Sequence, residues 1–332
     1  MATPVVSKNH GFNAYRHPAA ASLHMSAAPT VEMLQFLPMM PPMDPGATAT
    51  PVIRLEGGSI SQPVWVESMQ AVAFLDLDRG IQGLARPGNE FLPLPDLGMD
   101  VEAHGITLGG SLATMGTAEG CWLVEPSTAE VDPLPLKHIE KLSAGLELLI
   151  PVSRGRVVVG TEDGRFLIYS FEDPPVELLD GFEPGSLRGA CFSGNEGTLY
   201  IADDLSVMKV EVTLLRAECS ELTELPNLDA VLGEDSEITG VACDQKGNLY
   251  VSHTGGVVVV DDLGNALMRV ATPVPATGVC FGGPLFSDLF IAAGDTVWQM
   301  PTNIKGTKMM KSDLAQRADV YAFEKGKDIG DW

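Results

Sequence analysis

From residue 50 onward, short apolar runs alternate with clusters of turn residues, and no long segment has the spacing of an amphipathic helix. The pattern is clearest between residues 238 and 283. There, the predicted strands cover residues 240–244, 249–252, 257–260 and 266–270. Turn residues such as Gly247, which tolerates a positive φ, separate these strands. Four antiparallel strands within about 35–40 residues are typical of one blade of a β-propeller.

The same unit recurs six times along the chain. The residues that open the second strand of each unit are 40, 45, 42, 50 and 40 residues apart: Val72, Leu112, Val157, Leu199, Leu249 and Leu289. The sixth unit, residues 278–301, has only three obvious strands, so we expect residues 51–55 to supply the fourth and remove the free sheet edge. The sequence therefore predicts an all-β fold, a six-bladed β-propeller of four-stranded antiparallel blades.

The propeller is predicted to occupy residues 49–306, between a flexible N-terminal segment, residues 1–48, and a C-terminal tail, residues 307–332. The N-terminal segment has no acidic residue before Glu32 and only Lys8 and Arg16 as fixed positive charges. This composition fits either an unstructured tail or an organelle-targeting peptide. Residues 31–43 are too apolar for a simple linker, so they either dock on the propeller or belong to a partner-binding element.

The 332-residue chain is acidic, with 44 Asp and Glu against 21 Lys and Arg and a formal net charge of −23. Such a surface repels phosphate backbones and anionic headgroups, so nucleic-acid and polybasic membrane binding are not expected. No apolar run approaches the roughly 20 residues of a membrane-spanning helix. The five cysteines include no C-x-x-C pair, and an odd count suits a reducing compartment. We therefore expect a soluble, intracellular protein.

Three motifs stand out near the end of the predicted propeller: G-x-x-x-D-x-x-G-N-L-Y-V at residues 240–251, V-x-D-x-x-G-N at 259–265 and P-x-x-x-T-x-x-x-F-G-G at 273–283. They resemble motifs of the regucalcin/gluconolactonase family of six-bladed propellers. Residues 189–203 resemble the preceding blade, and the P-V-W segment at 63–65 resembles the first. Residues 238–261 alone also fit an NHL-type repeat, but the F-G-G and P-V-W segments favour the first family.

This resemblance implies a divalent cation in the central tunnel, held by a Glu, an Asn and an Asp at the starts of three first strands. Oxygen ligands of this kind suit Ca²⁺ or Mg²⁺. In this chain the motifs put Ser61, Arg188 and Thr239 at the three positions, and the substrate-side pair of the family falls near Glu147 and Leu148. We therefore predict no metal ligand and no cofactor, unless other groups hold Ca²⁺ or another divalent ion.

The residues that start the first strands are expected to ring the tunnel mouth: Ser61, His104, Ala144, Arg188, Thr239 and Thr277. None is a carboxylate, and Arg188 is the only fixed charge. Its guanidinium either binds an anion, with hydroxyl groups as further donors, or pairs with an acid such as Asp203 or Glu162 and plugs the tunnel. His104 acts as either a structural hydrogen-bonding group or a base. The predicted ligand-binding residues are Ser61, His104, Arg188, Thr239 and Thr277.

Seven polar residues at the ends of second strands are predicted to lie near one rim: Asp76, Asp78, Glu162, Asp163, Asp203, Asp204 and His253. They are either turn residues on a solvated face or a substitute cation site.

The common motifs of serine hydrolases, zinc proteases and nucleotide-binding proteins are absent from the sequence. Two classes of function remain. The first is a non-catalytic propeller that binds a small anionic molecule or a protein partner, and the alternative is a divergent metal-dependent lactone or ester hydrolase. Because function resides in the site rather than the fold, the degenerate ligand positions favour the binding module.

Overall fold

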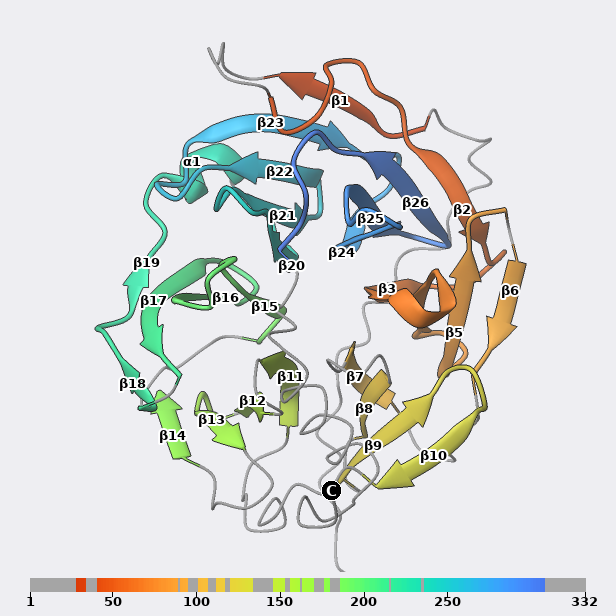
Figure 1. Ribbon diagram of the computed structural model, residues 1–332. Coiled ribbons are helices and arrows are strands. Elements are labelled where there is room, and N and C mark those ends of the chain that lie inside the picture. The colour runs from red at the N-terminus through yellow and green to blue at the C-terminus, as the bar shows by residue number, and fades with distance from the viewer. Residues whose placement is uncertain are drawn as a thin grey trace, which may run out of the picture.

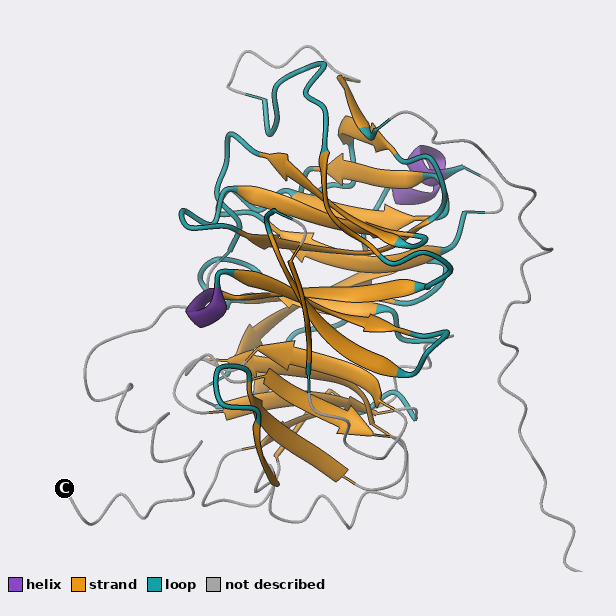
Figure 2. Cartoon of the chain, turned by 90° about the vertical axis from the view of Figure 1, so that its right-hand side faces the viewer, coloured by secondary structure: helices purple, strands orange, loops and turns teal. Residues whose placement is uncertain are grey.

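The computed structural model describes residues 28–33, 41–88, 90–94, 101–106, 112–116, 120–133, 146–152, 156–161, 163–169, 176–179, 186–214, 216–233 and 236–307. These residues form six antiparallel sheets arranged around a central axis (Figure 1). The side view shows strands throughout the body, with the two short helical segments η1 (Glu67–Met69) and α1 (Leu228–Leu232) at its margin (Figure 2). The predicted all-β propeller of antiparallel sheets is confirmed.

The first three sheets are continuous in sequence. They comprise β3 (Ile60–Val66), β4 (Ala71–Asp76), β5 (Ile81–Arg86) and β6 (Glu90–Pro93); β7 (Val101–Ile106), β8 (Leu112–Gly116), β9 (Gly120–Glu125) and β10 (Glu130–Pro133); and β11 (Leu146–Val152), β12 (Arg156–Thr161), β13 (Phe166–Tyr169) and β14 (Val176–Leu179). Each follows a simple meander, with the first strand nearest the axis.

The other three sheets have additions at their outer side. They comprise β15 (Gly189–Phe192), β16 (Thr198–Ala202) and β17 (Val207–Thr213), on which β18 (Glu218–Cys219) and β19 (Thr223–Glu224) both pair; β20 (Ile238–Cys243), β21 (Leu249–His253), β22 (Gly256–Val260) and β23 (Ala266–Ala271) with β1 (Thr30–Met33); and β24 (Ala276–Gly282), β25 (Asp288–Ala293) and β26 (Thr296–Pro301) with β2 (Thr50–Arg54). All six residues predicted to open the second strands lie in β4, β8, β12, β16, β21 and β25.

The innermost strands form a closed ring. Each contacts the next in the order β3, β7, β11, β15, β20 and β24, and β24 returns to contact β3. The walls between neighbouring sheets are apolar. In one of them, Trp65 stacks on Phe290 with ring centroids 5.1 Å apart. Burial of such walls supplies the main stabilising free energy, at about 25 cal/mol per Å² of apolar surface.

Two turns explain the recurring D-x-x-G-N motif. Asp244 accepts hydrogen bonds at Oδ1 from the backbone N–H groups of Lys246 and Asn248, and Gly247 adopts a φ of +85°. Asp261 repeats the pattern with Leu263 and Asn265, and Gly264 there has a φ of +78°. A Cβ on Gly264 would lie 1.7 Å from the carbonyl oxygen of Pro226. These motifs therefore shape the turns between strands.

The expected closure between the two ends of the chain is confirmed. β2 pairs antiparallel with β26, with Thr50 opposite Gln299 and Arg54 opposite Thr296. The Arg54 guanidinium also forms an ion pair with Asp295 at 3.0 Å. The last sheet thus obtains its outer strand from the N-terminal side, and β26 has no free edge.

The predicted boundary at residue 48 needs correction for part of the N-terminal segment. β1 pairs with β23, with Val31 opposite Val270, and adds a fifth strand to that sheet. Met43 is fully buried in the same hydrophobic cluster as Val31 and Met268. Burial of these apolar side chains attaches residues 28–33 and 41–48 to the propeller, so the docking interpretation of residues 31–43 is confirmed for the described part. Residues 1–27 and 308–332, including the proposed targeting peptide and most of the tail, lie outside the described residues.

In the described part of the chain, Cys191, Cys219, Cys243 and Cys280 are free thiols. None of the helices described there is long and apolar enough to cross a membrane.

Candidate functional site

The first strands share an irregularity near their starts. In five of the six described sheets, the pairing of the first strand with the second shifts by one residue, between Ser61 and Val64, Val101 and Ala103, Leu146 and Leu148, Ile238 and Gly240, and Ala276 and Gly278. Such a bulge places one extra residue on the first strand and redirects its side chain. The bulges therefore give a structural alignment of the sheets that is independent of sequence motifs.

The end of the second strand then marks six places, which we call the ring positions. Four of them are the extra residue of the bulge, whereas Ser61 pairs with Leu75 and its bulge follows it. Five directly follow a residue paired with the end of the second strand: Ser61, Glu102, Glu147, Thr239 and Thr277. Arg188 is the sixth. It directly precedes Gly189, which pairs with Ala202, just as Thr239 directly precedes Gly240, which pairs with Ser252. Four of the six residues predicted for the tunnel mouth hold ring positions.

The other two predicted residues do not hold ring positions, and the expectation that the ring contains no carboxylate is wrong. His104 pairs with Thr114 within β7, two residues beyond the ring position, which Glu102 holds. Ala144 lies outside the described residues, and Glu147 holds the third position. His104 and Ala144 were selected because a glycine follows each, as it follows Arg188, Thr239 and Thr277. In the first three sheets the residue after the ring position is not a glycine.

The glycines of the last three sheets have a different role, close approach between first strands. A Cβ on Gly189 would lie 3.4 Å from the Cα of Gly240, and one on Gly240 would lie 3.5 Å from the Cα of Gly278. A Cβ on Gly278 would lie only 2.6 Å from Cδ of Pro63. The first strands of the last three sheets thus approach each other closely, and at Gly278 the contact depends on the absence of a side chain.

We expect Gly278→Ala to destabilise the fold by about 1–3 kcal/mol, because the added methyl group meets the rigid ring of Pro63 and overpacking has costs of this size. Gly189→Ala is the matched control. Its Cβ would meet nothing closer than 3.3 Å, so a smaller loss is expected. Urea denaturation of both variants measures the difference, and equal midpoints would argue against close packing at the axis.

The hydroxyl groups at the ring positions connect neighbouring sheets. Ser61 Oγ donates to the carbonyl oxygen of Thr277 at 3.3 Å, and Thr277 Oγ1 donates to the carbonyl oxygen of Ile60. Thr239 Oγ1 lies 3.0 Å from both the carbonyl oxygen of Ala276 and the hydroxyl of Ser252. A hydroxyl has one proton to donate, and here each proton is directed at another protein group. Toward a ligand these three side chains therefore act as acceptors.

A cavity of about 300 Å³ lies among the first strands. Three ring positions contribute to its wall, Glu147, Arg188 and Thr239. The Arg188 side chain is exposed and forms no ion pair with any described carboxylate. The carboxylate of Glu147 accepts a hydrogen bond from the backbone N–H of Leu187 at 3.3 Å. The cavity thus presents opposite charges from two neighbouring sheets.

Most of the remaining wall is apolar, and it includes three thiols. Burial raises the pKa of the Cys191 and Cys280 thiols, and it raises the pKa of Cys243 to about 12. A thiolate is the nucleophilic form of cysteine, so these thiols are protonated and unreactive at neutral pH. They behave as small apolar groups in the cavity wall.

The far side of the cavity is bounded by the segment that follows β26. The backbone N–H of Thr307 donates to the carbonyl oxygen of Cys243 at 2.8 Å, and Thr307 lines the cavity. Gly306 bridges to Asp244, and a Cβ on Gly306 would lie 2.1 Å from the ring of Phe281. The chain therefore returns from β26 to the first strands around the axis.

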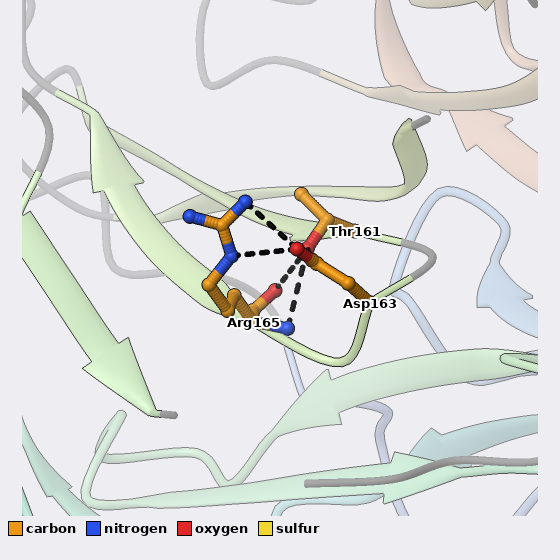
Figure 3. Close-up of polar contacts among 3 residues, drawn as sticks. All are labelled: Thr161, Asp163 and Arg165. Atoms are coloured by element: carbon orange, nitrogen blue, oxygen red, sulfur yellow. Dashed lines mark hydrogen bonds and ion pairs between the residues drawn. The ribbon is translucent and has the colours of Figure 1, made fainter. Parts of the chain in front are cut away.

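The rim residues outside the cavity are mostly engaged within their own turns. Asp163 accepts a hydrogen bond from Thr161 and forms an ion pair with Arg165 at 2.8 Å (Figure 3). These hydrogen bonds, that of Arg165 first, lower the pKa of Asp163. Asp76 forms an ion pair with Arg79, and Asp203 accepts from the N–H groups of Leu205 and Ser206. Asp163 and Asp203 are thus turn residues, as one of the two interpretations expected. Asp76 is not, because it is the last residue of β4 and is buried. Glu162 lies outside the described residues.

His253, at the end of β21, is buried and differs from the acids of the rim. Its Nδ1 accepts a hydrogen bond from the N–H of Gly255 at 3.1 Å, and its buried Nε2 has no hydrogen-bond partner among the described residues. Desolvation, followed by the nearby charge of Arg269, lowers the pKa of His253 to about 4. The imidazole is therefore neutral at physiological pH.

Comparison with known proteins agrees with this architecture. Residues 185–295 match the family described as SMP-30/gluconolactonase/LRE-like region. No curated protein sequence matches the chain. A solved structure of a candidate gluconolactonase has a TM-score of 0.68 and 18% identity over 80% of this chain and 96% of its own. For the gluconolactonase of Xanthomonas campestris, the TM-score is 0.67 and the identity is 16%, over 84% of this chain and 98% of that one. For the calcium-binding protein regucalcin of Agrobacterium tumefaciens, the TM-score is 0.62 and the identity is 14%, over 78% of this chain and 93% of that one.

At these identities the solved structures show a shared fold. The class of the molecule is therefore a β-propeller with a cavity among its innermost strands. Residues 185–295 match the model of the SMP-30/gluconolactonase/LRE-like family, and the resemblance predicted from the sequence motifs is confirmed.

Proposed function

We propose that this chain is a six-bladed propeller that binds a small organic anion in its axial cavity without transforming it. The observation that carries the proposal is the Arg188 side chain, which lines the cavity and has no described carboxylate partner. A guanidinium offers a planar fork of donors that suits a carboxylate. The six sheets and their closed ring of first strands support the count of six blades.

The alternative role of Arg188 as a plug finds no support in its contacts. Asp203, one of its two expected partners, uses Oδ1 to accept from Leu205 and Ser206 in its own turn. If Arg188 formed a buried ion pair, its replacement would lower the unfolding free energy strongly, because the partner would be left buried and unpaired. An exposed guanidinium beside a cavity can instead be replaced with little effect on stability.

The family resemblance raises the question of a divalent cation. Ser61, Arg188 and Thr239 at the implied ligand positions do not suit one, because Arg188 is itself a cation and the two hydroxyl groups are directed at protein groups. Among the described residues, no group of three or more His, Cys, Asp and Glu is placed to hold a metal ion. The proposed binding therefore uses the side chains of the chain itself.

We expect Arg188→Ala to weaken the binding of 4-methylpentanoate or gluconate by about 10–100-fold, since a hydrogen bond to a charged group contributes about 1.5–3 kcal/mol. The unfolding free energy should change by less than about 0.5 kcal/mol, as at other exposed sites. Isothermal titration calorimetry measures the affinities. Arg165→Ala is the matched control, because Arg165 pairs with Asp163 outside the cavity. Undiminished binding by Arg188→Ala, or no binding by the wild type, would refute the proposal.

A second candidate is a divergent metal-dependent lactone or ester hydrolase. It is favoured by one observation, the carboxylic residues Glu102 and Glu147 at ring positions of two neighbouring sheets. Carboxylate oxygens are the ligands that Ca²⁺ and Mg²⁺ prefer. Calorimetric titration with both ions, coupled to an aldonolactone hydrolysis assay, tests it. Micromolar metal binding with turnover would replace the binding module by the enzyme.

A further inference from the structure

The cavity wall offers a ligand one unpaired charge. Apart from the thiols, its described polar side chains are Gln62, Glu147, Arg188, Thr239 and Thr307. The hydroxyl of Thr307 donates to the carbonyl oxygen of Asp244 at 3.1 Å, and that of Thr239 is directed at Ala276 or Ser252. Gln62 and Glu147 also interact with other groups of the protein. Arg188, which forms no ion pair with a described carboxylate, is therefore the group in this wall that can hold a charged ligand.

The rest of the wall has few partners for hydroxyl groups of a ligand. Cys191 in β15 and Cys280 in β24 each lie two residues beyond a glycine, Gly189 or Gly278, so they hold matching places on their strands. Both are partly exposed and line the cavity. Because burial raises the pKa of each thiol, neither is charged at neutral pH. A thiol is a weak hydrogen-bonding group, and a polar group buried without a partner costs free energy. Hydroxyl groups on a ligand would therefore weaken its binding.

The apolar part of the cavity continues away from Arg188 along the first strands. Ser61 holds the ring position of β3, and Trp65 follows it by four residues, at most about 13 Å at about 3.3 Å per residue. The Trp65 side chain is 5% exposed and lines the cavity. A Cβ on Gly282, the last residue of β24, would lie 2.6 Å from the Trp65 ring. Trp65 thus marks the end of the cavity opposite the ring positions.

The volume of the cavity limits the size of the ligand. About 300 Å³ is at the small end of the range of ligand pockets. At about 30 Å³ per water molecule, this space holds about ten non-hydrogen atoms. An eight-carbon monocarboxylic acid has this size.

We propose that the cavity binds a medium-chain monocarboxylic acid, with its carboxylate at Arg188 and its alkyl chain directed along the first strands toward Trp65. This inference rests on the proposed function, the binding of an organic anion at Arg188, and adds the apolar body of the ligand. The same wall discriminates against hydroxylated acids such as gluconate.

The first test compares hexanoate with gluconate, which has the same six-carbon skeleton and five hydroxyl groups. By isothermal titration calorimetry, we expect the wild type to bind hexanoate at least about tenfold more tightly, the effect of one buried hydroxyl group without a partner. From butanoate to octanoate, each added CH₂ group should improve the affinity by about fourfold. Dodecanoate, which exceeds the volume of the cavity, should bind no more tightly than octanoate.

The second test locates the two ends of the ligand. Bromine quenches the fluorescence of a tryptophan that it contacts. In 8-bromooctanoate the bromine lies at the end of the chain, whereas in 2-bromooctanoate it lies beside the carboxylate. At saturation, we expect the 8-bromo acid to quench the wild type more strongly than the 2-bromo acid. Folded Trp65→Phe, as checked by circular dichroism, should lose this difference.

The outcomes separate this inference from the proposed function. Equal affinity for hexanoate and gluconate, or an affinity that does not increase from butanoate to octanoate, overturns the apolar ligand and leaves anion binding at Arg188 intact. Equal quenching by the two bromo acids, or a difference that persists in folded Trp65→Phe, overturns the direction of the chain toward Trp65. Failure of every acid to bind the wild type overturns the proposed function itself.

Discussion

Removal of residues 1–57 is expected to unfold or aggregate the protein. The truncation deletes β2 and exposes the paired edge of β26. It also removes Val52 and Ile53, which are 1% and 2% exposed, and each such side chain contributes about 1.5–3 kcal/mol through burial. Free sheet edges promote association between molecules. Size-exclusion chromatography and thermal unfolding followed by circular dichroism measure both effects.

A shorter truncation, removal of residues 1–45, is the control for this prediction. It deletes β1 and Met43 but retains β2 and the closure with β26. A loss of about 2–5 kcal/mol is expected, the usual cost of truncating a buried methionine, and the protein should remain soluble and folded. Similar behaviour of the two truncations would show that the pairing of β2 with β26 does not determine the stability of the ring.

Acidification should destabilise the protein through His253. Its folded pKa of about 4 lies below the ordinary histidine pKa of 6.5, so the unfolded chain takes up a proton that the folded chain excludes. The contribution to stability is complete above pH 6.5 and is lost as the pH falls toward 4. With about 1.4 kcal/mol per pKa unit, the loss amounts to about 3 kcal/mol.

The His253→Asn variant isolates this effect from the titration of the many carboxylates. An asparagine Oδ1 can accept the hydrogen bond that Nδ1 accepts from Gly255, and asparagine does not titrate. The difference in unfolding free energy between wild type and variant, measured by urea denaturation at several pH values, should decrease steadily below pH 6.5. Parallel profiles would mean that His253 is protonated equally in both states.

The repeating strands could be predicted from sequence because each blade contains a local signal. β-Branched and aromatic runs such as residues 257–260, and turns such as that at Gly247, specify a hairpin through contacts within a few residues. The outer strand β2 was also predictable, since the last unit lacked one strand and a propeller requires a partner for β26. The short β1 carried no comparable signal, because its pairing with β23 depends on the burial of Val31 and Met43 against Met268.

The ring positions were predicted only in part. Arg188 and Thr239 were found because each precedes a glycine within a recognisable motif. That glycine allows close approach between strands in the last three sheets, and it does not mark the ring position in the first three. Glu102 was therefore missed, and Glu147 was named only near the substrate-side pair that the resemblance implies. Both ring positions could have been found by counting back along the chain from the residue that opens the second strand, with one residue added for the bulge in the first strand.

The pairing of β2 with β26 also sets the order of events during synthesis. Thr50 and Gln299, which form a hydrogen bond across this closure, are 249 residues apart in the chain. Strands emerging from the ribosome can form hairpins as soon as they appear, because their contacts are local. β2, however, has no partner until the last sheet has been made. The ring therefore closes only after translation of β26, and until then an apolar strand near the start of the nascent chain remains available to chaperones or to the wrong sheet edge.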